Sequence, residues 1–77
     1  MKELLTYLIK EITGEDDFTI EEIQENNHLS LNVFANPSIL GLIIGKNGST
    51  IKAIQTIARV KGRLENKSVF VNVNEKN

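Results

Sequence analysis

The apolar positions near the N-terminus recur with the period of an α-helix. Five aliphatic residues lie one, three or four positions apart, so they form a single stripe on a helix covering roughly residues 2–13. They are Leu4, Leu5, Leu8, Ile9 and Ile12. Gly14 follows directly and is suited to end this helix, because helix C-termini often need the left-handed conformation that glycine adopts easily.

The next two segments alternate between apolar and polar residues, as half-buried strands do. Residues 18–21 predict a first strand, although Ile23 breaks the alternation and suggests a bulge or an early end. The turn-forming residues 25–28 separate it from a second run with a regular alternation. The inward positions of that run are Leu29, Leu31 and Val33. We therefore expect a hairpin of two antiparallel strands.

A pair of helices should follow the hairpin. Asn36 as N-cap and Pro37 at the first helical position form a good helix start, and the helix should end after two turns at Gly45. Its apolar stripe is Ile39, Leu40, Ile43 and Ile44. Ser49 is expected to cap a longer helix that ends at Gly62. The buried face of this longer helix is predicted to contain Ile51, Ile54, Ile57 and Ala58.

The last alternating run predicts a closing strand over about residues 68–74, and residues 74–77 are expected to form a frayed tail. The full order is helix, strand, strand, helix, helix, strand. This order favours an α+β fold in which helices cover one face of a three-stranded mixed sheet. We expect residues 1–77 to form a single domain.

Composition narrows the class of function. The chain has 77 residues, one His and no Cys, so thiolate chemistry, disulfides, Cys-based zinc sites and His-paired metal sites are excluded. A domain of this size buries only about 60% of its unfolded surface, which disfavours an enclosed active-site cavity. The carboxylate pairs Asp16-Asp17 and Glu21-Glu22 lack neighbours that would desolvate them. We expect no enzymatic activity, no small-molecule substrate, no metal and no cofactor.

The net charge of −1 conceals a strong asymmetry along the chain. Residues 1–25 carry two lysines against eight carboxylates, a net −6, whereas residues 26–77 carry seven cations against two carboxylates, a net +5. A molecule divided in this way can present a basic face to a polyanion. The sequence shows neither a signal peptide nor a membrane span, so we expect a cytoplasmic protein without membrane association.

The glycines of the loop between the two predicted central helices are the most unusual feature. Gly45 and Gly48 allow a tight reversal and leave the backbone open to close approach, and Lys46 adds a cation between them. The helix that starts near Ser49 presents free N–H groups that favour a phosphate, and Lys52 lies one turn further on. The loop is chemically suited to hold a sugar-phosphate backbone.

Two other phosphate-binding motifs do not fit this loop. A Walker A motif needs four residues between its first glycine and Gly-Lys-Ser/Thr, but only three separate Gly41 from Gly45, and Asn47 replaces the hydroxyl residue. A dinucleotide fingerprint needs G-x-G-x-x-G after a strand, whereas this loop follows a predicted helix. The spacing instead matches G-x-x-G between two helices.

The loop and its flanks resemble the I-I-G-x-x-G-x-x-I signature of KH domains. Residues 43–51 read Ile-Ile-Gly-Lys-Asn-Gly-Ser-Thr-Ile. The predicted element order resembles the type II, bacterial arrangement, and the chain resembles the small single-KH RNA-binding proteins of bacteria, the KhpA-type family. The resemblance covers residues 1–75. Between the glycines, this chain has one cation where relatives often have two basic or polar residues.

The resemblance implies roles for particular residues. Gly45, Lys46, Asn47 and Gly48 would form the phosphate clamp, and Ile44 and Ile51 would form walls of an aliphatic groove for bases. With only four aromatic residues in the chain, an RNP-type stacking sheet is not expected. The cations Arg59, Lys61 and Arg63 are assigned to the negative end of the second central helix.

The resemblance also implies partners. The family binds RNA, pairs with itself or with a larger KH-containing protein, and has no catalytic activity. Our hypothesis is therefore a module that binds single-stranded RNA and acts in post-transcriptional regulation or ribosome-related RNA metabolism. Two alternatives stay open: an assembly module whose partner surface is the acidic N-terminal third, and binding of single-stranded DNA.

Overall fold

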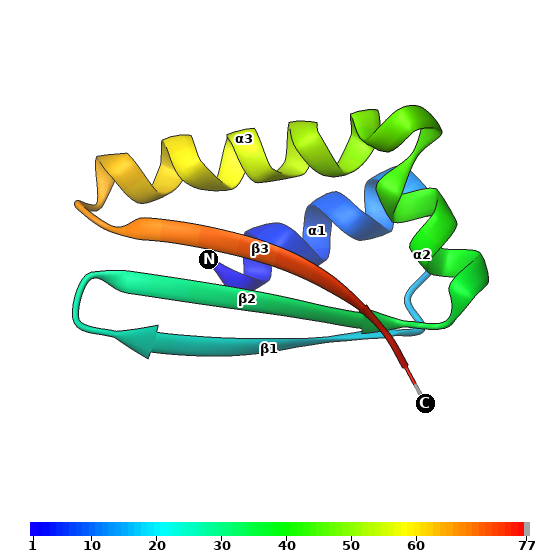
Figure 1. The fold of residues 1–77 in the computed structure, drawn as a ribbon, viewed down its shortest axis with the longest axis horizontal. Helices are drawn as coiled ribbons and strands as arrows, with labels where there is room; N and C mark the ends of the chain where they lie inside the picture. The colour runs from blue at the N-terminus through cyan, green and yellow to red at the C-terminus, as the bar shows by residue number, and fades with distance from the viewer. Residues whose placement is uncertain (77) are drawn as a thin grey trace.

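The computed structural model of the chain describes residues 1–76 and has the predicted order of elements (Figure 1). The elements are α1 (Lys2–Thr13), β1 (Phe18–Glu25), β2 (His28–Ala35), α2 (Pro37–Ile44), a 3-10 turn η1 (Lys46–Gly48), α3 (Ser49–Leu64) and β3 (Ser68–Glu75). The helices cover one face of a three-stranded sheet. The predicted α+β fold with a mixed sheet is therefore confirmed.

The sheet has the order β1-β2-β3, with β2 in the centre. β1 pairs antiparallel with β2 through a tight turn at Asn26 and Asn27, and Asn26 has a φ of 53°. β2 and β3 run parallel, and this pairing is bounded by hydrogen bonds from Ser68 N to Asn27 O (2.7 Å) and from Lys76 N to Ala35 O (2.8 Å). The connection between these parallel strands consists of α2 and α3.

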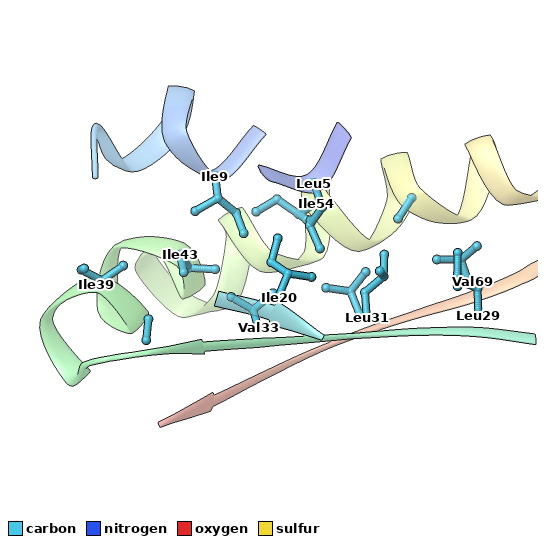
Figure 2. Packing of buried hydrophobic residues seen from close by; sticks show 13 residues of the cluster. Leu5, Ile9, Ile20, Leu29, Leu31, Val33, Ile39, Ile43, Ile54 and Val69 are labelled. Carbon is cyan, nitrogen blue, oxygen red and sulfur yellow. The ribbon is translucent and has the colours of Figure 1, made fainter. Parts of the chain in front are cut away.

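The core lies between β2 and the three helices (Figure 2). The alternate residues of β2 that face the helices are 0–3% exposed. They are Leu29, Leu31, Val33 and Ala35. Leu5 from α1, Ile43 from α2 and Ile54 from α3 are each at most 1% exposed and pack into the same cluster. Every buried residue within 1–76 is apolar, so burial of aliphatic surface is the main stabilising term.

Two predicted helix boundaries are confirmed in atomic detail. The side-chain Oδ1 of Asn36 accepts a hydrogen bond from Ile39 N at 3.0 Å, and Pro37 occupies the first turn of α2. Gly14 ends α1 in the left-handed conformation (φ 70°), and its N–H donates to Lys10 O at 2.8 Å. Local capping chemistry therefore defines these two ends.

The expected bulge or early end at Ile23 is wrong. Residues 18–25 pair one to one with residues of β2, so β1 is continuous to its last residue. Ile23 pairs with Ser30 and lies on the face of the sheet opposite the helices, where it is 42% exposed. The alternation breaks because an apolar residue occupies an outward position, not because the backbone is irregular.

Three expectations about α3 also need correction. Ser49 is already helical (φ −65°, ψ −39°) and makes no capping hydrogen bond, because Gly48 occupies the N-cap position. Ile57 is 44% exposed and not part of the core. The helix continues past Gly62 to Leu64, because Gly62 serves close packing and does not end the helix.

The predicted frayed tail is wrong for the residues that the structure describes. Asn74 and Glu75, which were assigned to the tail, pair with Phe34 and Ala35, so β3 extends one residue beyond its expected end. Asn77 lies outside the described residues. Within residues 1–76, no helix combines the length and apolar character needed to cross a membrane.

The contrast between Gly62 and Gly41 provides a test of the packing. A methyl group at Gly62 would collide with the Val69 side chain and lie 2.9 Å from Lys67 O, whereas one at Gly41 meets nothing within 4 Å. We expect Gly62→Ala to lower the free energy of unfolding by about 1–3 kcal/mol through overpacking. Gly41→Ala should raise it by about 0.5–1 kcal/mol, because alanine favours helix. Urea unfolding of both variants checks this, and equal effects would contradict the packing.

Candidate nucleic-acid interface

The turn between α2 and α3 depends on the backbone conformation of Gly45. This residue has φ 74° and ψ 178°, a region that is almost exclusive to glycine. A methyl group here would lie 2.6 Å from the Thr50 Cβ, so space as well as conformation requires glycine. The Gly45 N–H donates to Gly41 O at 2.9 Å and closes the last turn of α2.

The remainder of the turn uses two more left-handed residues. Asn47 (φ 56°, ψ 26°) and Gly48 (φ 75°, ψ 13°) both adopt this conformation, which asparagine and glycine tolerate best. The Gly48 N–H donates to Gly45 O at 3.2 Å and closes η1. A methyl group at Gly48 would meet no atom within 4 Å, so its outer side is open to a ligand.

The predicted clamp residues lie together at one end of the molecule, where α2 meets α3 (Figure 1). The side chains of Lys46 and Asn47 are exposed at the tip of the turn, and Ser49 and Lys52 are exposed on the first turn of α3. Cations beside a helix N-terminus favour a bound phosphate through their charge, the helix dipole and the free N–H groups.

The two isoleucines assigned to groove walls differ in their surroundings. Ile44 is 36% exposed at the end of α2 and is available to a ligand. Ile51 is half-buried and packs against the core cluster, so only part of its side chain faces outward. Ile51 therefore contributes first to the fold and second to any groove.

The structure reveals a basic cleft that the sequence reasoning missed. Arg59, Arg63 and Lys67 line a cleft between α3 and the outer edge of β3. On the same side, the Gln55 Nε2 donates to Val71 O at 3.0 Å, which bridges α3 to β3. Lys52, Gln55, Arg59 and Arg63 recur at spacings of three and four, so they share one face of α3 that leads from the turn to the cleft. This spacing was the signal available in the sequence.

The predicted cluster of Arg59, Lys61 and Arg63 is divided by the fold. Lys61 lies on another side of α3, where its Nζ is 3.9 Å from the Glu65 carboxylate and its neighbours include Leu4 of α1. Only the two arginines line the cleft beside β3. The helix dipole acts on all three cations alike, and only the position of β3 separates Lys61 from the two arginines.

Carboxylates predominate at one edge of the sheet and the basic cleft lies at the other, although the Asp17 carboxylate lies 4.0 Å from the Nζ of Lys76, just beyond the end of β3. The exposed carboxylates of β1 and the preceding loop lie at the edge farthest from α3, which packs on β3 (Figure 1). They are Glu15, Asp16, Asp17, Glu21, Glu22 and Glu25. The basic cleft beside β3 therefore lies away from these carboxylates.

No group of three potential metal ligands occurs in the part of the chain that the structure describes.

A turn of the form G-x-x-G joining two helices, within a helix-strand-strand-helix-helix-strand fold, defines a KH domain. The comparisons identify the family more closely. The family model for the KhpA/KhpB KH domain matches residues 2–73, so the chain belongs to this family. It is not a family of enzymes, as the sequence analysis predicted.

Individual relatives agree with this assignment over almost the whole chain. The RNA-binding protein KhpA of Clostridium perfringens is 31% identical over 74 residues, which is 95% of this chain and 99% of the relative. The RNA-binding protein KhpA of Chlamydia trachomatis is 32% identical over 76 residues, which is 97% of each chain. That of Chlamydia pneumoniae is 38% identical over 58 residues, which is 74% of each chain. The predicted family resemblance is confirmed.

The two glycines of the turn should differ in their tolerance of a side chain. Gly45→Ala combines a glycine-only conformation with a collision, so it should lower the free energy of unfolding by about 3 kcal/mol. Gly48→Ala meets open space and should cost only about 1 kcal/mol. Chemical unfolding measures both, with Gly14→Ala (φ 70°, open space) as the matched control for Gly48. A smaller effect at Gly45 than at Gly48 would contradict the described turn.

Proposed function

We propose that this protein is a non-catalytic module that binds single-stranded RNA. The observation that carries the proposal is the open G-x-x-G turn at the N-terminus of α3, with Lys46 exposed at its tip. In this proposal Gly45, Lys46, Asn47 and Gly48 hold the sugar-phosphate backbone, because the glycines permit close approach and the helix end favours negative charge.

The path of the strand beyond the turn follows the basic face of α3. Arg59 lies ten residues beyond Ser49, a distance of about 15 Å along the helix, which is within reach of a few nucleotides. The cations of the cleft would neutralise the following phosphates, while bases lie against Ile44 and the exposed part of Ile51. Few phosphates are contacted, so affinity should be modest and should fall steeply with salt.

The names of the relatives support RNA as the ligand. Those described above are named RNA-binding proteins. We extend this to the present chain and infer a cytoplasmic protein with the type II arrangement that acts in post-transcriptional regulation or ribosome-related RNA metabolism. Single-stranded DNA remains an alternative, because a clamp on phosphates does not read the 2′-OH.

The first test reverses the charge of the turn. We expect the double variant Lys46→Asp, Asn47→Asp to lose binding to a labelled single-stranded RNA in fluorescence anisotropy, because carboxylates repel the phosphates that the turn would hold. Wild-type binding should weaken steeply between low and high salt. Titration with DNA of the same sequence distinguishes the two nucleic acids.

The control for this test has the same change in net charge elsewhere. Lys10→Glu combined with Gln24→Glu also adds three negative charges, but on the exposed surfaces of α1 and β1. This variant should keep most of the wild-type affinity, and circular dichroism should show that both variants fold. If the turn variant binds as well as the control, the G-x-x-G sequence is only a turn and the proposal is wrong.

A second proposal concerns a protein partner. Ile57, Val60 and Leu64 of α3 are 44%, 52% and 77% exposed, and with Leu4 of α1 they line an apolar face. An exposed apolar face of this kind is typical of an interaction surface. An acidic partner surface was one of the alternatives left open by the sequence, and the exposure of these apolar residues favours the α1–α3 face instead.

We propose that the α1–α3 face binds a second KH chain, either another copy of this protein or a larger KH-containing protein. The charges beside the face, Lys61 and Glu65, compensate each other, so two copies would not repel there. Pairing would also join two weak RNA sites and raise their effective affinity without new contacts.

This pairing predicts a reversible dimer in sedimentation equilibrium. Val60→Asp should weaken dimerisation at least tenfold, because association would bury an unpaired charge. Ile23→Asp is the matched control, since it places the same charge on a similarly exposed apolar residue of the opposite sheet face. If the wild-type protein stays monomeric at all accessible concentrations, self-association is wrong.

A further inference from the structure

The face of the sheet opposite the helices carries an aromatic residue at its edge. In the register of the sheet, Ile23 of β1, Ser30 of β2 and Phe70 of β3 form one row across this open face. Phe70 lies on the edge strand β3 and is 54% exposed. Its neighbours Val69 and Val71, which face the helices, are each only 4% exposed. A large aromatic ring therefore lies where the open face meets the outer edge of the sheet.

The ring of Phe70 lies beside the ring of His28. The two ring centroids are 6.3 Å apart, with an angle of 25° between the planes, so the rings lie in a stacked arrangement. His28 is exposed at the first position of β2. Its partner on β3 is Ser68, which lies two positions before Phe70 on the same strand. This contact limits the orientations of Phe70 and holds an aromatic surface in place.

Phe70 is also part of the basic cleft. It lines the cleft together with Arg59, Arg63 and Lys67, and it borders the adjoining hollow lined by Gln55 and Asn72. A nucleic-acid strand whose phosphates met these cations would pass along the outer edge of β3. The Phe70 ring would then be within reach of a base turned toward the open face.

We propose that Phe70, supported by His28, stacks on one nucleobase of the strand held by the G-x-x-G turn. This inference rests on the proposed function and adds to it a subsite on the open face of the sheet. The small number of aromatic residues argues against a sheet that stacks several bases, but a single subsite needs only one ring. Stacking tolerates any base, because every base has a π-face.

Polar groups beside the ring would add hydrogen bonds to the stacked base. Asn72 lies two positions along β3 from Phe70, so it faces the same side, and its Nδ2 donates to Asn32 Oδ1 at 3.4 Å across the strands. The amides have further donors and acceptors available for base edges. Stacking would supply most of the affinity, and these amides a modest base preference.

The test compares two Phe→Leu variants on the same face of the sheet. Phe70→Leu removes the ring at the cleft, and Phe34→Leu is the matched control because Phe34 pairs with Thr19 and Asn74 near the other end of the strands. In anisotropy titrations with a short mixed-sequence RNA, Phe70→Leu should bind about tenfold more weakly. Phe34→Leu should bind as the wild type does, and Phe70→Tyr should keep the affinity because it keeps the ring.

Two further readouts distinguish stacking from a loss of structure or of charge. Phe70→Leu should leave the dependence of affinity on salt unchanged, because it removes no cation. In a set of RNAs with one abasic nucleotide each, one position should weaken binding to the wild type but not to Phe70→Leu. This coupling is the signature of a base that contacts the ring.

The outcomes separate this inference from the function on which it rests. If Phe70→Leu binds like the wild type while the turn variant does not bind, the stacking subsite is wrong and the phosphate clamp stands. If Phe34→Leu weakens binding equally, or if no abasic position couples to Phe70, the subsite is also wrong. If the wild-type protein binds no RNA, both proposals fail together.

Discussion

The burial of the helix-facing residues of β2 is the interaction on which the rest of the structure depends. Leu29, Leu31, Val33 and Ala35 form a continuous aliphatic row that contacts all three helices through one core. β2 is also the only strand with a neighbour on each side within the described sheet, so it sets the register of both others. Because each buried Leu or Val side chain contributes about 1.5–3 kcal/mol, this row, together with Val69 and Val71 of β3, stabilises the packing of α2 and α3 on the sheet and hence the position of the turn between them.

The turn between α2 and α3 combines rigid ends with an open middle. Ile43 and Ile54 are 0% and 1% exposed, so the helices on both sides of the turn are fixed in the core. Between them, Gly45, Asn47 and Gly48 adopt positive φ angles that let the chain reverse without covering the backbone. A site built in this way is preorganised, because little conformational freedom is lost when a ligand binds. The function therefore lies in a short loop, and the stability lies in the elements that hold it.

Local patterns predicted most of the fold, and three of the errors share one cause. The helix end at Gly14 and the start at Asn36 depend on capping within a few residues, so the sequence alone was sufficient. The errors at Ile23, Ile57 and Gly62 concern surfaces that meet, or fail to meet, a partner element. From the sequence alone, an isoleucine suggests a core position and a glycine suggests a helix end. Only the position of the neighbouring strand or helix shows whether this is correct. The same limit applied to Arg59 and Arg63. That they line a cleft could not be predicted until β3 was placed beside their side of α3.

The sequence by itself determined the class of fold, the G-x-x-G turn and the family, because these depend on residue types at fixed spacings. Gly45, Lys46, Asn47 and Gly48 are contiguous, and no long-range contact is needed to bring them together. The tertiary structure alone decided which surfaces lie along α3 and β3 beyond this turn. It aligned the basic face of α3 with the edge of β3, and it brought Phe70 next to His28, 42 positions earlier in the chain. The first juxtaposition follows from the packing of α3 on β3. The second follows from the parallel pairing of β2 with β3, which joins residues far apart in the sequence and leaves no local signal.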